Sequence, residues 1–123
     1  MNRPLVGRSI LIVEDEPLIA LDIRRSFEAA GARVVVMRTL QTALAAVEDP
    51  DLSAAILDHA LGKDDSSQLC ERLKERDIPF VIHSGYSNLE GACREGVAID
   101  KPSHPQLLVT TIVSLLRSRP ISH

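Results

Sequence analysis

Residues 10–17 read Ile-Leu-Ile-Val-Glu-Asp-Glu-Pro, which is four apolar residues, three acids and a proline. The apolar run does not alternate with polar residues, a pattern typical of a strand buried on both faces of a parallel sheet. Charged residues begin where such a strand should stop. The stretch therefore predicts a buried parallel strand that delivers acidic side chains to one edge of a sheet.

Four further apolar runs share this character, and helical spacing separates them. Ile19, Ile23 and Phe27 recur every four residues before Gly31, which indicates a helix after the first strand. Five strand–helix units predict a flavodoxin-like, doubly wound α/β fold with five parallel strands in the order 2-1-3-4-5. The other four runs are Val34–Val36, Ala54–Leu57, Phe80–Ile82 and Val97–Ile99.

The remaining helices differ in how clearly the sequence marks them. The second spans the apolar stripe 40–47 and should end by Asp49-Pro50, and the third should begin near Asp65-Ser66. The fifth should follow a cap at Ser103 with an early proline. The fourth, within residues 87–96, is predicted to be short and the softest part of the domain, because Gly91 lies inside it.

Length, composition and charge indicate a single soluble domain and disfavour nucleic-acid-binding and membrane-spanning proteins. The 123 residues suit one domain over 1–123 with a core of about 8–118, and 45% apolar with 25% charged residues is ordinary for a soluble protein. A net charge of −3 disfavours nucleic acid as a direct partner. No apolar run approaches the ~20 residues of a membrane span. The start of the chain leaves no room for a signal peptide before the first strand, so we expect a cytoplasmic protein.

The two cysteines, Cys70 and Cys93, fall in different helical segments. In a cytoplasmic protein cysteines are usually reduced. The sequence therefore favours two free thiols over a disulfide.

Polar residues follow four of the five predicted strands. In the order 2-1-3-4-5, strands 1, 3, 4 and 5 are neighbours, and their carboxyl ends meet at one edge, where ligands bind in such sheets. Acids, a hydroxyl and an amine are therefore expected to converge there. The residues after these strands are Glu14-Asp15-Glu16, Asp58, Ser84-Gly85-Tyr86 and Lys101-Pro102.

This set of side chains suits phosphoryl chemistry. Crowded carboxylates repel one another unless a cation joins them, and Mg²⁺ is the usual hard cation beside phosphates. Lys101 and Ser84 could each hold a phosphoryl oxygen, and the Asp58 carboxylate is a plausible nucleophile that would form an aspartyl phosphate. Alone, Asp58 could be a mere turn residue; its combination with Asp15, Ser84 and Lys101 favours the functional interpretation.

Four segments together resemble the response-regulator receiver domain of bacterial two-component signalling. They lie in the family's order at the predicted strand ends, and the resemblance covers essentially the whole chain. The segments are Ile-Leu-Ile-Val-Glu-Asp-Glu-Pro (10–17), Ile-Leu-Asp (56–58), Ser-Gly-Tyr (84–86) and Lys-Pro (101–102).

The resemblance implies a metal site for Mg²⁺. Asp15 matches the direct metal ligand, and Asp58 shares the ion. Glu14 matches an acidic neighbour that usually acts through water, and Ala60 stands where a backbone carbonyl completes the shell. Glu16 is interpreted as an ordinary solvated acid near a helix start.

The resemblance also implies a reaction and partners. Asp58 matches the phosphoacceptor, Ser84 the hydroxyl that moves toward the phosphoryl group, and Lys101 the lysine that pairs with it. We expect a stand-alone receiver: a histidine kinase or phosphotransfer protein would donate the phosphoryl group, and the output would be contact with a downstream protein. Such a receiver is not an enzyme with a separate substrate, although it assists its own phosphorylation and dephosphorylation.

The chain departs from the family pattern in its switch region. The residues after the phosphoacceptor read His59-Ala60-Leu61-Gly62, without the usual hydrophobic-proline pair. Ala98 stands where an aromatic usually swings with the hydroxyl, so Tyr86 could substitute, or residues 85–96 could order and disorder. We expect His59 to lie at the surface and His83 to be a satisfied polar residue within the fourth strand.

A finer resemblance is to the single-domain alphaproteobacterial receivers called FATGUY, which are tied to general stress signalling. Leu-Gly after the aspartate, Pro79-Phe80, Gly85-Tyr86 and the short fourth helix carry it. Their Phe-Ala-Thr-Gly motif is only partly met.

Other functions remain open at this point. A receiver that is never phosphorylated could act as an interaction module, and the chain could be a receiver cut from a hybrid histidine kinase. A flavin or nucleotide enzyme is disfavoured because acids replace the glycine-rich phosphate loop after the first strand. A phosphatase would want a second aspartate at the position of Ala60.

Overall fold

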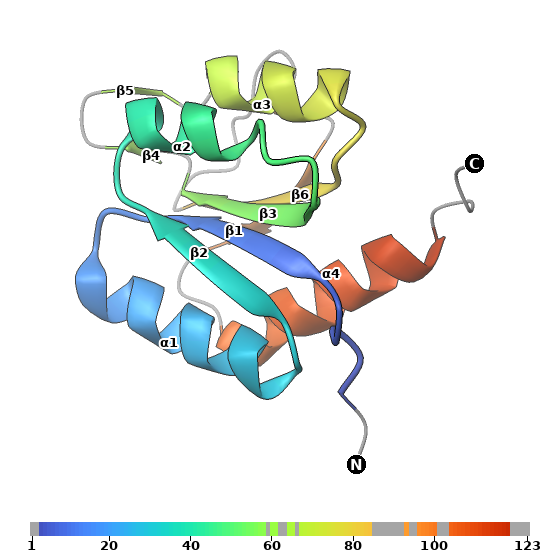
Figure 1. Ribbon diagram of the computed structural model, residues 1–123. Helices are drawn as coiled ribbons and strands as arrows, with labels where there is room; N and C mark the ends of the chain where they lie inside the picture. Colours follow the sequence, from blue (N-terminus) through green and yellow to red (C-terminus); the bar gives the residue numbers. More distant parts are fainter. Residues whose placement is uncertain are drawn as a thin grey trace.

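The computed structural model describes residues 3–58, 60–61, 64–65, 67–84, 93, 96–100 and 104–118. A five-stranded parallel sheet lies between two layers of helices (Figure 1). The elements are β1 Ser9–Val13, α1 Pro17–Ala29, β2 Arg33–Met37, α2 Leu40–Ala46, β3 Leu52–Asp58, β4 Ala60–Leu61, β5 Asp64–Asp65, α3 Ser67–Glu75, β6 Phe80–Ser84, β7 Val97–Asp100 and α4 Pro105–Ser118.

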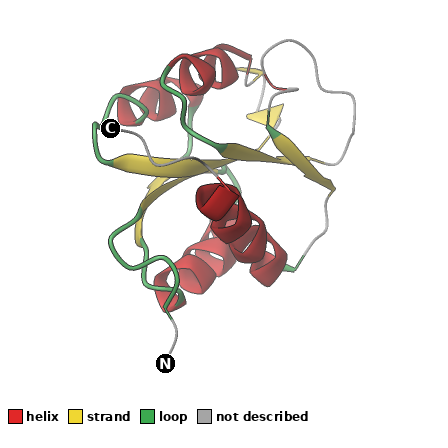
Figure 2. Ribbon diagram, turned by 90° about the vertical axis from the view of Figure 1, so that its right-hand side faces the viewer, coloured by secondary structure: helices red, strands yellow, loops and turns green. Residues whose placement is uncertain are grey.

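The strand order of the sheet is β2-β1-β3-β6-β7, which is the predicted 2-1-3-4-5 order. Helices α1 and α4 cover one face, and α2 and α3 cover the other (Figures 1 and 2). The flavodoxin-like fold expected from the sequence is thereby confirmed. Among the described residues, no helix combines the length and apolar character needed to cross a membrane.

Two hydrophobic clusters, one on each face of the sheet, form the core. Along β1, Leu11 and Val13 pack toward α2 and α3, whereas Ile10 and Ile12 pack toward α1 and α4. All five residues of β1 are buried. Successive strand residues point to opposite faces, so a strand covered on both sides needs an unbroken apolar run.

Helix boundaries agree with the sequence at most points. Helix α1 ends before Gly31, as predicted, and Pro105 is the first residue of α4. The expected cap at Ser103 and most of the predicted fourth helix, residues 87–96, lie outside the described residues.

Helix α3 begins at Ser67, directly after the predicted start near Asp65-Ser66. Asp65 instead pairs with Ala60, and Asp64 with Leu61, in an antiparallel hairpin of β4 and β5. Two-residue strands leave no periodicity in a sequence, which is why this hairpin was not predicted.

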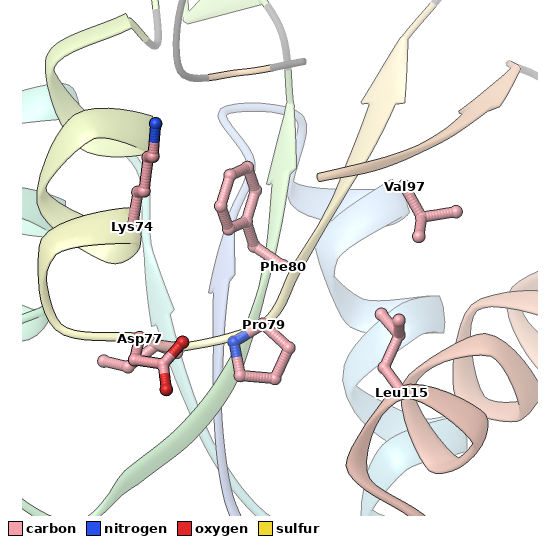
Figure 3. A pocket seen from close by; sticks show the side chains of 7 residues that line it. Lys74, Asp77, Pro79, Phe80, Val97 and Leu115 are labelled. Atoms are coloured by element: carbon pink, nitrogen blue, oxygen red, sulfur yellow. The ribbon is translucent and has the colours of Figure 1, made fainter. Parts of the chain in front are cut away.

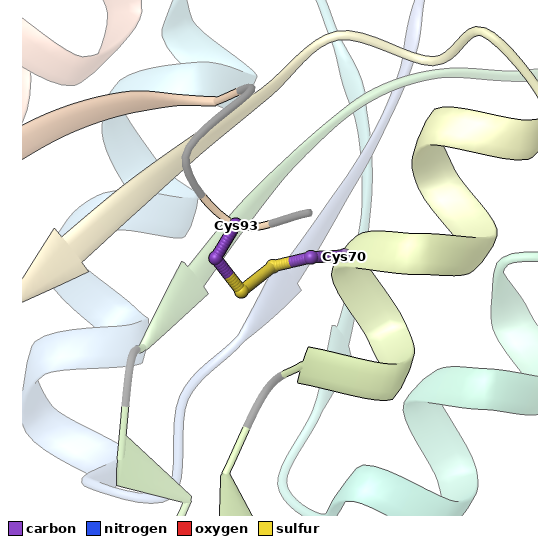
Figure 4. The surroundings of a disulfide bond; sticks show 2 residues. All are labelled: Cys70 and Cys93. Atoms are coloured by element: carbon purple, nitrogen blue, oxygen red, sulfur yellow. A yellow bond between two sulfur atoms is a disulfide. The ribbon is translucent and has the colours of Figure 1, made fainter. Parts of the chain in front are cut away.

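The expectation of two free thiols was wrong. Cys70, in α3, and Cys93, between β6 and β7, form a disulfide with a Cα–Cα distance of 5.0 Å (Figure 4). Both side chains belong to the hydrophobic cluster under α2 and α3, which brings the two segments together. Helical periodicity gives the face of each segment but not the distance between segments.

We predict that reducing this disulfide destabilises the fold without abolishing it. The bond spans a sequence separation of 23 residues, and a loop of this size corresponds to about 3 kcal/mol of unfolding free energy in the chain-entropy view. Urea unfolding with and without a reductant would measure the difference. The Cys70→Ala/Cys93→Ala variant should be insensitive to reductant, and equal midpoints for oxidised and reduced wild type would contradict the prediction.

Glycine is required where α1 turns into β2. Gly31 has φ +100°, and a Cβ there would lie 2.6 Å from Val6 Cγ2 and 2.9 Å from the Val6 backbone nitrogen. Gly7 also has a positive φ, of +83°, but a Cβ there would meet nothing within 4 Å. A side chain at Gly31 would therefore meet both backbone strain and steric overlap, whereas a side chain at Gly7 would meet backbone strain alone.

Gly31→Ala should lower the free energy of unfolding by roughly 2–3 kcal/mol, because strain and overlap add. Gly7→Ala, the matched control, should lose only about 1 kcal/mol from strain. Chemical denaturation of both variants would test this. Equal losses would mean that the N-terminal turn yields to accommodate the added methyl group.

Candidate functional site

Three carboxylates meet at the carboxyl ends of β1 and β3. Val13 and Leu57 are register partners in these neighbouring strands, so Glu14 and Asp58 leave the sheet side by side. Carboxylate oxygens of Glu14, Asp15 and Asp58 all lie within 4.8 Å of one another. The structure thus brings together three residues that the sequence placed at this edge, toward the left in Figure 1.

These carboxylates differ in exposure. Glu14 is 2% exposed and Asp58 7% exposed, whereas Asp15 faces solvent. Two buried carboxylates beside a third repel one another, and burial reduces the water that would screen them. Such a cluster is expensive without a cation, and one side open to solvent gives an ion access.

Local backbone geometry fixes the two acids from β1. The Glu14 backbone nitrogen donates to the Met37 carbonyl at 3.0 Å, which ties this residue to the end of β2. The Glu14 carboxylate accepts from the Glu16 backbone nitrogen at 3.2 Å. Helix α1 begins directly afterwards at Pro17, so the positive end of its dipole lies near the acids and offsets part of their repulsion.

Arg38 is a neighbour of the site that the sequence reading missed. It follows β2, and its Nη2 donates to the Asp15 carbonyl at 3.5 Å. The signal was available, because β2 ends at the same edge of the sheet as the strands that supply the acids. The guanidinium brings positive charge beside the carboxylates.

The other predicted site residues are placed less fully. Ser84 ends β6, the strand next to β3, and pairs in register with Asp100, the last residue of β7. Ala60 begins β4 shortly after Asp58, and its role as a backbone ligand stays a prediction. Lys101 directly follows β7, but Lys101 and Tyr86 lie outside the described residues.

The structure also places His83 and Ala98, two residues near the site whose roles the sequence analysis considered. His83 is the register partner of Asp58 and is 5% exposed, so it lies buried within β6 as predicted. That its polar atoms are satisfied stays a prediction. Ala98, where an aromatic was expected from the family, lies exposed in β7 opposite Ile82. His59 lies outside the described residues.

Two hollows flank opposite edges of the sheet. One of about 200 Å³ lies beside Glu14, between α1 and β2, with Leu21, Val36 and Arg38 among its lining. Another of about 250 Å³ lies where β6 and β7 begin, with Lys74 and Asp77 on one side and Val97 and Leu115 on the other (Figure 3). Only the first adjoins the carboxylates.

The donor set fits a hard divalent cation. Carboxylate and carbonyl oxygens are the ligands that Mg²⁺ prefers, and it is commonly held by one or two carboxylates together with water and phosphate. The cluster offers carboxylates from Asp15 and Asp58 with Glu14 behind them. An ion there would neutralise the repulsion and leave coordination positions for a phosphoryl oxygen.

Comparison with known proteins places this arrangement in a family context. The family model described as "Response regulator receiver domain" matches residues 10–113. The two-component response regulator PprB of Pseudomonas aeruginosa is 33% identical over 112 residues, which cover 82% of this chain. They cover 41% of PprB, so the chain spans less than half the length of this relative.

Solved structures agree with the fold. SdrG from Sphingomonas melonis Fr1 superimposes with a TM-score of 0.75 at 38% identity, covering 92% of this chain and 98% of SdrG. The receiver domain of sensor histidine kinase PA1611 from Pseudomonas aeruginosa PAO1 superimposes with a TM-score of 0.77 at 22% identity, covering 92% of this chain and all of that one. The PA1611 structure has a magnesium ion coordinated in its active site cleft.

We predict that Mg²⁺ stabilises the fold through this cluster. At about one hundred times its dissociation constant, a ligand that binds only the folded state adds about 2.7 kcal/mol to the unfolding free energy. Asp15→Asn should lose most of this gain, while its stability without Mg²⁺ should not fall, because a repulsive charge is removed. Thermal unfolding with and without Mg²⁺ would measure both quantities.

Glu16→Gln is the matched control for this experiment. Glu16 is an exposed acid next to Asp15, its side chain makes no capping hydrogen bond, and it lies outside the cluster. It should retain the full Mg²⁺ effect. A full effect in Asp15→Asn as well would place the ion elsewhere.

Proposed function

We propose, from the premise that this chain belongs to the response-regulator receiver family, that it accepts a phosphoryl group on Asp58 from a histidine kinase or phosphotransfer protein. The observation that carries the proposal is the gathering of Glu14, Asp15 and Asp58 at the carboxyl ends of β1 and β3. Asp58 is the last residue of β3 and is largely covered, so the strand delivers its carboxylate to this edge of the sheet.

Phosphoryl transfer to Asp58 would form one bond and break one. A carboxylate oxygen of Asp58 attacks phosphorus, and the bond from phosphorus to the donor's histidine nitrogen breaks, its electron pair staying with that nitrogen. Mg²⁺, when bound, supplies charge neutralisation at the phosphoryl oxygens. Asp15 and Asp58 would hold the ion directly, Glu14 would act through water, and the Ala60 carbonyl would complete the protein ligands.

Two further residues would act on the phosphoryl group once it is attached. The Ser84 hydroxyl would donate to one phosphoryl oxygen, and the Lys101 ammonium would pair with another. Ser84 ends the strand next to Asp58, and Lys101 follows the strand beyond it, which supports this assignment. With Ala98 in place of the usual aromatic, we propose Ser84 and Tyr86 as the switch residues.

The output would be contact with a downstream protein. Net charge is −3, so duplex binding by this domain has no electrostatic support. Histidine kinases take their phosphoryl group from ATP, so a cytoplasmic setting follows from the proposed donor. The chain would act as a stand-alone receiver, a phosphoacceptor that assists its own phosphorylation and dephosphorylation without turning over a separate substrate; a receiver cut from a hybrid histidine kinase is the alternative. The finer FATGUY resemblance stays a prediction.

Incubation with acetyl phosphate tests the proposal. We expect the intact mass to rise by one phosphoryl group in the presence of Mg²⁺ and not in its absence. Asp58→Asn should abolish the gain, because an amide is not a nucleophile toward phosphorus. Peptide mapping after trapping of the acyl phosphate would identify the residue.

Asp51→Asn is the matched control, because Asp51 immediately precedes the other end of β3 and is exposed. It should label as the wild type does. If small donors and a panel of histidine kinases all fail to label the wild type, the proposal fails and the interaction-only receiver takes its place. Labelling that persists in Asp58→Asn would assign the acceptor to another residue.

A further inference from the structure

The disulfide between Cys70 and Cys93 joins two segments that leave the candidate site. Helix α3, which carries Cys70, follows β3 and its terminal Asp58 by way of the β4–β5 hairpin. Cys93 lies in the connection that begins after Ser84 and leads to β7 (Figure 4). We infer that the pair is a reversible thiol–disulfide site whose oxidation lowers the phosphorylation of Asp58. This inference rests on the proposed function.

Both sulfurs lie in the hydrophobic core, so exchange with an external thiol or disulfide requires a local opening that exposes one of them, followed by return to the same packing. Cys70 is 0% exposed and Cys93 2% exposed, and both pack in the cluster that contains Leu69, Leu73 and Ile82. A reduced cysteine behaves as a small apolar side chain, so this core can hold two thiols in place of the disulfide. The aliphatic packing holds α3 to the sheet in both states, and the bond adds to the stability of the oxidised state.

Oxidation would restrain motion between the two segments. A change that starts at Asp58 and Ser84 reaches the rest of the protein through the chain that leaves these residues. The bond fixes Cys93 to α3 at a Cα–Cα distance of 5.0 Å, so it opposes any relative displacement of the two segments. If phosphorylation favours an arrangement in which the two segments are displaced, it disfavours the disulfide. Thermodynamic linkage then requires that the disulfide disfavour phosphorylation by the same factor.

The proposed cytoplasmic location favours a reversible disulfide over a permanent one. Disulfides persist in oxidising compartments, whereas cytoplasmic thiols are kept reduced, and the disulfides found there are usually transient, catalytic or redox-sensing. A receiver that takes phosphoryl groups from a kinase in the cytoplasm and carries two cysteines placed to bond fits the sensing class.

The redox step balances with a disulfide as oxidant. The two thiols give up two protons and two electrons and form the sulfur–sulfur bond, and a small-molecule disulfide such as glutathione disulfide is reduced to two thiols. The reaction passes through a mixed disulfide, which the second cysteine resolves by attack of its thiolate. A dithiol reverses the reaction by the same route.

The first test is a thiol count on the folded wild-type protein. The protein is equilibrated in glutathione buffers that span the ratios of reducing and oxidising compartments, quenched with acid, unfolded and alkylated. We expect two alkyl groups at the reducing end, none at the oxidising end and a transition between them. A count of no alkyl groups in every buffer would mean that the disulfide is permanent, and a count of two in every buffer would mean that it does not form. Either result overturns the inference.

The second test compares phosphorylation in the two redox states. With acetyl phosphate and Mg²⁺, the reduced wild type should reach a higher steady-state phosphorylated fraction than the oxidised form, with ratios of phosphorylated to unphosphorylated protein that differ by about fivefold or more. Cys70→Ala/Cys93→Ala is the control. It should match the reduced wild type and be indifferent to reductant, which separates the effect of the bond from any effect of the reagent.

The outcomes distinguish this inference from the proposed function. Equal phosphorylation of oxidised and reduced wild type, with Asp58 labelled in both, overturns the inference and leaves the proposed function standing. Absence of label in both states overturns the proposed function and with it the regulation. If the double variant folds poorly, the comparison between the two redox states of the wild type still decides, since the chain is identical.

Discussion

Burial of β1 and β3 on both faces is the constraint from which the rest of the structure follows. Each strand lies between two helical layers, so neither face tolerates a charged side chain, and every residue from Ser9 to Val13 is buried. A polar group can appear only where the helices stop covering the strand, at its ends. The acids at the carboxyl edge are therefore the first residues in these strands for which the fold permits charge.

That edge also concentrates electrostatic energy. Glu14 and Asp58 remain largely covered although both are acids, and Asp15 adds a third carboxylate within the same 4.8 Å. The start of α1 and the guanidinium of Arg38 offset part of the repulsion. The remaining repulsion would favour binding of a cation, because an ion held between the carboxylates would neutralise it. A bound ion would in turn offer coordination positions to a phosphoryl oxygen, which is the chemistry proposed for Asp58.

Much of this could be predicted from the sequence, for a physical reason that also marks where prediction stops. Doubly buried strands must be apolar runs, so Ile10–Val13 and Ala54–Leu57 revealed the sheet, its order and the acids at its edge. Contacts between segments that are distant in the sequence produce no comparable pattern of apolar residues, so they could not be predicted. The β4–β5 hairpin involves two residues a side, and Cys70 meets Cys93 through packing under α3. Periodicity specifies which face a residue occupies and is silent on what stands opposite.

The disulfide and the carboxylates together divide the domain into two functional parts. The sheet holds the acids rigidly, since β1 and β3 are pinned on both faces and cannot respond to a ligand without disturbing two cores. Response must therefore pass through the connections that leave the sheet, of which α3 and the segment containing Cys93 are the two that begin beside Asp58 and Ser84. A covalent bond between Cys70 and Cys93 would act on these connections without touching the carboxylates of Glu14, Asp15 and Asp58. Burial of β1 and β3 therefore has two consequences. It places the carboxylates at the edge of the sheet, and it leaves the proposed redox control to the connections outside the sheet.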